Sequence, residues 1–149
     1  MSTTGVNPVN EIKFGVCTTG RPASDTTATY TVVKDAESLS ISIDGNIEEW
    51  NPMDQAGWGR KLMTAKSLSI EMGGKRNYGD PGNDYVAGLA WKNGQDCNSQ
   101  MQITFPDGGK LVVPCVIEVT SMGGDSTAID ALEWTAHSDG APTYTEPTT

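Results

Sequence analysis

The sequence predicts a mainly β protein, an antiparallel β-sandwich with one flanking α-helix and one long hairpin loop. Three observations carry this prediction. Several segments alternate apolar and polar residues with a period of two, and one segment shows helical periodicity instead. Gly, Ser and Thr are frequent while Phe is scarce, a balance typical of β structure with many turns. The 149 residues have the size of a single domain, so we expect one domain over residues 1–149.

The expected strands follow from the alternating segments, which are residues 11–18, 27–35, 37–44, 65–72, 99–105, 109–121 and 127–138. In each strand, alternate side chains share one face of the sheet. We expect the apolar sets to face the protein core, and these are Leu39, Ile41, Ile43, Leu68, Ile70, Met72, Leu132, Trp134 and Ala136. The sequence FPDGGKL predicts a hairpin turn with Asp107-Gly108 at its tip.

The helix is predicted in the sequence that follows Gly79. Asp80 is suited to cap its N-terminus, Pro81 suits its first position and Gly94 is placed to end it. The apolar side chains on one face of this helix of about three turns would pack on the outside of the sandwich. They are Tyr85, Val86, Leu89 and Ala90.

Composition and motifs argue against several classes of function. The net charge of −9 and the pI near 4.4 disfavour a basic nucleic-acid-binding groove. None of the common nucleotide-binding, hydrolase or metalloprotease motifs occurs, and the single histidine, His137, reads as an ordinary surface residue. Cys17, Cys97 and Cys115 lack the spacing of a zinc site and are expected to be buried free thiols. We therefore expect no enzyme activity, cofactor, metal site or membrane segment, and folding in the cytoplasm.

The sequence SLSI occurs twice, at residues 38–41 and 67–70, and each copy places serines on the face opposite its apolar residues. Short polar side chains suit a wet, uncrowded surface such as a channel wall, although an ordinary solvated sheet face would also explain them. The full candidate set on this face is Ser38, Ser40, Ser42, Asp44, Ser67, Ser69 and Glu71. Whether Glu133 and Thr135 of the last long strand share this surface stays open.

The joining segment, residues 45–63, is long for a hairpin loop, and loops beyond about 12–15 residues are usually functional or disordered. Tryptophans flanked by charges are typical of protein–protein contacts. The alternative is that the tryptophans pin the loop to its own domain. The candidate contact residues are Glu48, Glu49, Trp50, Asp54, Trp58, Arg60 and Lys61.

In this arrangement the chain resembles the tail tube proteins, or major tail proteins, of long-tailed bacteriophages. The resemblance covers about residues 10–145 and is carried by four blocks in order along the chain. The blocks are DAESLSISIDGNIEEWNPMDQAGWGRKLMTAKSLSIEMGGKR, NYGDPGNDYVAGLAW, MQITFPDGGKLVVPCVIEVTS and GGDSTAIDALEWTAHSDGAPTYT. The resemblance implies a sandwich or flattened barrel with an outer helix, assembled as hexameric rings that stack into a hollow tube.

The resemblance also implies roles for the candidate residues. The serine face, with Asp44 and Glu71, would line an acidic lumen through which DNA passes without specific binding. The long hairpin loop would reach the neighbouring ring, and flexible arms at about residues 1–10 and 140–149 would make further contacts. Expected partners are other copies of the chain, the tape measure protein, the tail terminator and baseplate or tip proteins. The expected location is the virion tail, assembled in the host cytoplasm.

One alternative from another class of function remains. A small carbohydrate-binding or adhesive β-sandwich would use Trp50 and Trp58 as a platform for sugar rings and would stay monomeric. A tube subunit would instead form rings or tubes, so the state of assembly separates the two predictions.

Overall fold

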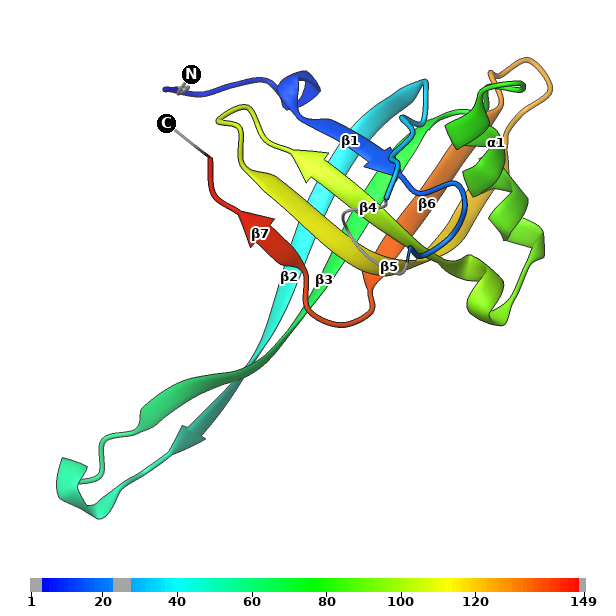
Figure 1. The fold of residues 1–149 in the computed structure, drawn as a ribbon. Helices are drawn as coiled ribbons and strands as arrows, with labels where there is room; N and C mark the ends of the chain where they lie inside the picture. Colours follow the sequence, from blue (N-terminus) through cyan, green and yellow to red (C-terminus); the bar gives the residue numbers. More distant parts are fainter. Residues whose placement is uncertain (1–3, 23–27, 148–149) are drawn as a thin grey trace.

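The computed structural model describes residues 4–22 and 28–147 and contains one antiparallel sheet (Figure 1). Its neighbouring strands follow the order β1-β4-β5-β6-β3-β2, and β7 pairs with β5 beside this path. The mainly β fold with one α-helix is confirmed, and the sheet does not close into a barrel. The strands are β1 Lys13–Val16, β2 Ala36–Trp50, β3 Arg60–Lys75, β4 Asn98–Thr104, β5 Lys110–Gly123, β6 Ala131–Ser138 and β7 Thr143–Thr145.

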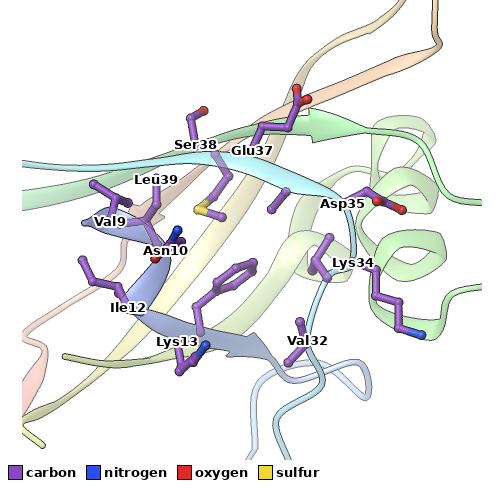
Figure 2. Close-up of a pocket in the computed structure, with 14 residues that line it drawn as sticks. Val9, Asn10, Ile12, Lys13, Val32, Lys34, Asp35, Glu37, Ser38 and Leu39 are labelled. Atoms are coloured by element: carbon purple, nitrogen blue, oxygen red, sulfur yellow. The ribbon is translucent and has the colours of Figure 1, made fainter. Parts of the chain in front are cut away.

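The sheet curves until its two edge strands, β1 and β2, flank a common cavity of about 340 Å³ (Figure 2). Phe14 of β1, Leu39 of β2 and Met72 of β3 are among the residues that line it. The described strands form no hydrogen-bonded ladder across this gap. The right-handed twist of β-strands favours such curvature of the sheet. In this protein the curvature is too small to bring β1 and β2 into hydrogen-bonding contact.

The core lies on one face of the curved sheet. Alternate residues of β3, β4, β5 and β6 are buried there, as the period of two requires. Val86, Ala87 and Leu89 of the helical segment cover this face, and Val33 closes it near the start of β2. The buried strand residues of this core are Val16, Ile70, Met72, Met101, Ile103, Val113, Cys115, Ile117, Leu132, Trp134 and Ala136.

The predicted helix starts where expected but ends earlier. In α1 (Pro81–Gly88) the Asp80 side chain accepts a hydrogen bond from the Asn83 backbone N–H at 3.0 Å. After Gly88 the chain tightens into the 3₁₀ turn η4 (Leu89–Trp91), and Gly94 begins the 3₁₀ turn η5 (Gly94–Cys97) instead of ending the helix. The tighter turn places Leu89 in the core, so packing overrides the expected length of three turns.

The expected strand over residues 27–35 is wrong within the described residues, and Thr27 lies outside them. Only Thr31 forms a bridge, with Val16 at the end of β1. The strand β1 has four residues and offers a short edge for pairing. The chain then turns at Asp35, whose φ of 64° is left-handed, and enters β2.

Two smaller expectations are confirmed. The hairpin between β4 and β5 turns at Asp107-Gly108, where Gly108 has a φ of 94° and the Asp107 side chain accepts from the Gly109 N–H at 2.9 Å. All three cysteines are free and buried.

Candidate functional site: a polar sheet face and a projecting hairpin arm

The two SLSI segments lie opposite each other in the β2–β3 hairpin. Ser40 pairs with Glu71, Ile41 with Ile70 and Ser42 with Ser69 in the antiparallel register. Because partners across a ladder point to the same side, the apolar residues share one face and the serines share the other. All seven candidate residues between Ser38 and Glu71 therefore belong to one sheet face.

This polar face continues across β6 and β5. Glu71 lies opposite Thr135, which lies opposite Glu118, and Ser69 lies opposite His137. Glu133 follows in the next row, opposite Gly73. The open question about β6 thus has a structural answer, because Glu133 and Thr135 are on the same sheet face as the serines. We define the polar face as Ser38, Ser40, Ser42, Asp44, Ser67, Ser69, Glu71, Glu118, Glu133, Thr135 and His137.

Carboxylates dominate the charge of the polar face. Asp44, Glu71, Glu118 and Glu133 are exposed, and the one imidazole, His137, places Nε2 2.8 Å from Oε1 of Glu118. A shallow depression of about 350 Å³ opens between Ser38, Glu71 and Glu133 and their neighbours. Within the described residues no helix covers this side, because α1 and η4 pack against the opposite face of the sheet. The result is a broad, wet and acidic surface of short side chains.

At Gly73, in the middle of the polar face, no side chain projects from the sheet. A Cβ at this position would lie 2.9 Å from Oγ of Ser38 and 3.9 Å from Oε1 of Glu133. The absence of a side chain therefore leaves Ser38 and Glu133 on either side of bare backbone.

Beyond the body, β2 and β3 continue as a two-stranded ribbon (Figure 1). The pairing of β3 with β6 stops at Ser69 and His137, whereas β2 and β3 stay paired as far as Trp50 and Arg60. We call residues 45–66 the hairpin arm. The expected loop of residues 45–63 is therefore wrong in its bounds, since only residues 51–59 lie between the strands, including the 3₁₀ turn η3 (Met53–Gln55). The alternation of apolar and polar residues that predicted strands at 37–44 and 65–72 is lost in the arm. Neither face of the ribbon there packs against the body, so no face has to be apolar.

The same change corrects the predicted core position of Ile43. This side chain is 66% exposed, whereas Ile41, Leu39 and Leu68 pack partly against the core and Ile70 and Met72 are buried. Ile43 lies opposite Leu68, one step beyond the last residue of β3 that pairs with β6.

The tip of the arm exposes large apolar side chains. Met53 is 100% and Trp58 77% exposed, so the alternative in which the tryptophans pin this segment to its own domain is wrong. Trp50 is partly covered by the Arg60 guanidinium, whose carbon lies 5.4 Å from the ring centroid. The predicted contact residues Glu49 and Lys61 form an ion pair at 3.6 Å, and Glu48 and Asp54 are exposed.

The structure groups the fourteen candidate residues into two sets and adds residues that sequence analysis missed. The polar face gains Glu118 and His137, because a strand pairing that joins β5 to β6 could not be read from one sequence. Within residues 4–22 and 28–147, no helix is long and apolar enough to cross a membrane. The same residues bring no three His, Cys, Asp or Glu side chains together where they could hold a metal ion.

Comparison with known proteins identifies the class of molecule to which these surfaces belong. The family model for the phage tail tube protein matches residues 19–144. A chain in the tail of an empty gene transfer agent particle, refined with helical and C6 symmetry, matches with a TM-score of 0.71 and 16% identity over 95% of this chain and 100% of that chain. A chain of the native gene transfer agent virion matches with a TM-score of 0.69 and 17% identity over the same shares. A search of curated proteins finds no match.

The fold is thus that of a structural subunit of phage-like tails. Since the family model covers most of the chain, the protein belongs to the phage tail tube protein family. The resemblance expected from the four sequence blocks is confirmed at the level of family and fold. Nothing in the family or the fold gives positive evidence of catalysis.

Proposed function

We propose that this chain forms hexameric rings that stack into a hollow tail tube and that the tube conducts DNA to the host. The observation that carries the proposal is the polar face: eleven residues from four neighbouring strands form one uncovered, acidic sheet surface opposite the covered core. Support also comes from the C6 symmetry stated for the similar tail structure. A cyclic ring that is stacked by head-to-tail contacts gives an open filament.

In this proposal the polar face lines the lumen. The carboxylates of Asp44, Glu71, Glu118 and Glu133 repel the phosphates of passing DNA, and the serine hydroxyls keep the wall hydrated. Screening limits the repulsion to about 8 Å at physiological ionic strength, so it acts as a non-adhesive layer at the wall. No base-reading or phosphate-binding residue is needed for such a role.

The hairpin arm makes the contacts between rings in the same proposal. A two-stranded ribbon is marginally stable at best by itself, and this one leaves apolar side chains uncovered on both faces. In the same proposal the chain forms one domain over residues 1–149, and its two end segments, at about residues 1–10 and 140–149, add further contacts between subunits. The expectation that the whole C-terminal segment is a flexible arm is wrong for Thr143–Thr145, which form strand β7 and pair with β5. The tape measure protein, the tail terminator and baseplate or tip proteins are the proposed partners at the lumen and the two tube ends, in a virion assembled in the host cytoplasm.

Electron microscopy of the purified, concentrated protein at near-neutral pH tests the assembly. We expect six-fold rings or tubes. A chain that stays monomeric and binds glycans would instead favour the sugar-binding alternative, in which Trp50 and Trp58 contact sugar rings.

A double charge reversal tests the lumen. Asp44→Lys with Glu71→Lys is expected to leave tubes intact and to slow or stop DNA release from particles built with the variant chain. The matched control, Glu11→Lys with Asp96→Lys, changes net charge equally at exposed positions outside the polar face and should release DNA normally. Normal release with the first variant would show that the polar face does not line the channel.

A further inference from the structure

Besides the exposed apolar tip of the hairpin arm, a second apolar surface lies at the root of the arm, where the arm joins the body. It is on the side of the sheet opposite the polar face. It is an open groove of about 850 Å³ between β2 and β3 on one side and the β6–β7 connection on the other. We call it the root groove. Its principal apolar lining residues are Ile43, Leu68, Phe105, Leu111, Pro142 and Tyr144.

The described part of the chain forms the walls of the root groove but does not occupy it. Phe105 and Tyr144 support each other with ring centroids 6.4 Å apart, and β7 holds Tyr144 opposite Leu111 on β5. Ile43 and Tyr144 nevertheless stay more than half exposed. A concave apolar surface of this size on a folded body is typical of a contact site.

The chain itself carries side chains suited to fill such a groove, at the tip of the hairpin arm. Met53 and Trp58 are large, apolar and exposed, and both project from the loop between β2 and β3. Aromatic and Met side chains are enriched at the centres of protein interfaces. The tip and the groove therefore have matching chemistry.

The tip cannot fill the root groove of its own chain. Ile43 in the groove and Trp50 near the tip are seven residue steps apart, and paired strands rise by about 3.3 Å per step, which gives roughly 23 Å. The ribbon runs away from the body along this whole length (Figure 1). The groove that receives the tip must therefore belong to another copy.

Charge also matches the two surfaces. Lys66 is the one charged residue that lines the root groove, and among the described residues no carboxylate forms an ion pair with it. At the tip, Lys61 is paired with Glu49 and Arg60 covers Trp50. Within the part of the chain that the structure describes, the carboxylates of Glu48 and Asp54 form no ion pair. An acidic tip approaching a groove with a lysine is electrostatically complementary.

We propose that the root groove of one copy receives the hairpin tip of a second copy, with Met53 and Trp58 as the inserted side chains and Lys66 facing the tip carboxylates. The proposal rests on the proposed tube function and assigns the receiving surface on the partner copy. Tip and groove are different surfaces of the same chain, so the contact is head-to-tail and extends without closing on a pair.

Cysteine cross-linking between two variants tests the assignment. One variant carries Met53→Cys at the tip and the other Ala141→Cys in the exposed wall of the groove. The native cysteines are buried, so they contribute little background. When the two variants assemble together and are oxidised, we expect a cross-linked dimer that is lost when either is assembled alone. Asn93→Cys, exposed beside η4, replaces the groove variant as control and should give no dimer.

A blocking variant makes the same test without cysteine. Ala141→Arg should fill the groove and reduce tube length or abolish tubes while the monomer keeps its thermal stability, whereas Asn93→Arg should assemble normally. Tubes that form in the mixed sample without the tip-to-groove cross-link overturn the groove assignment and leave the proposed function standing. Wild-type chains that form neither rings nor tubes overturn the proposed function, and the groove assignment falls with it.

Discussion

The two halves of the β2–β3 hairpin have the same pairing but opposite surroundings. In the body, Ile70 and Met72 are buried, while in the arm Ile47 and Met63 are 56% and 45% exposed. Both halves are antiparallel, and both contain apolar residues. The difference is the third strand, because β6 pairs with β3 only from Ser69 onward.

This comparison shows that burial in a sheet is set by neighbours and not by the pattern of one hairpin. The body half gains strand β6 and the core beneath it, and it is stable within one chain. The arm half keeps only its own ladder and leaves its apolar side chains in water. Apolar residues retained in such a place are expected to be covered when copies of the chain assemble.

The largest contrast is expected from truncating one isoleucine in each half. Ile70→Ala removes a fully buried side chain and is expected to lower the free energy of unfolding by about 2–5 kcal/mol. Ile47→Ala removes an exposed one and should change it by less than about 0.5 kcal/mol. Urea unfolding of the monomer measures both values. Equal losses in the two variants would contradict the division between body and arm.

A second contrast comes from two glycines on opposite sides of that division. A Cβ at Gly74 would clash with the backbone carbonyl oxygen of Asp35, so the chain itself must move. At Gly45 the nearest atoms, at 2.6 and 2.7 Å, belong to the end of the flexible Met63 side chain, which can rotate away. We expect Gly74→Ala to destabilise the monomer by about 1–3 kcal/mol and Gly45→Ala to be nearly neutral.

Thermal unfolding of the two glycine variants, each compared with the wild type, measures this second contrast. A loss at Gly45 as large as the loss at Gly74 would mean that the arm packs as rigidly as the body. Such a result would remove the main structural reason for expecting the arm to be completed by another copy.

Much of the body could be predicted from the sequence because local rules decide it. The alternation at Leu132, Trp134 and Ala136 identified the buried face of β6, and the Asp80-Pro81 pair identified the start of the helix. The serine face was predicted for the same reason, since the period of two fixes which side chains lie together. The resemblance of four sequence blocks to tail tube proteins also predicted the family, which the family model confirms.

What the sequence could not predict depends on contacts between distant segments. Ile43 has the same alternation as Ile41, yet it lies where β6 has ended. Glu118 joins the polar face through a register between β5 and β6 that includes a shift between Val119 and Ser121. The root groove needs Phe105 and Tyr144 to meet across β5 and β7, and no local pattern contains that pairing.

A third contrast, small near neutral pH, is a difference in pH dependence that belongs to the body alone. Burial, the main cause, raises the pKa of the Cys115 thiol from 9.0 to about 12, while the nearby Arg21 guanidinium opposes the shift. The unfolded thiol loses its proton above pH 9.0, whereas the folded one keeps it, so the folded state binds more protons in this interval. The thiol's contribution to stability is therefore full below pH 9.0 and is lost as the pH rises towards about 12.

Urea unfolding of wild type and Cys115→Ala at several alkaline pH values measures this contribution. The wild type should lose up to about 1.4 kcal/mol more per pH unit than the variant once the unfolded thiol ionises. Burial also raises the pKa of Tyr85, but that residue is present in both proteins and cancels in the difference. Ile47→Ala, in the arm, should keep the wild-type slope, because it leaves Cys115 in place. Parallel pH profiles for wild type and Cys115→Ala would mean that water reaches the thiol, and the buried face of β5 would then be as open as the ribbon beyond it.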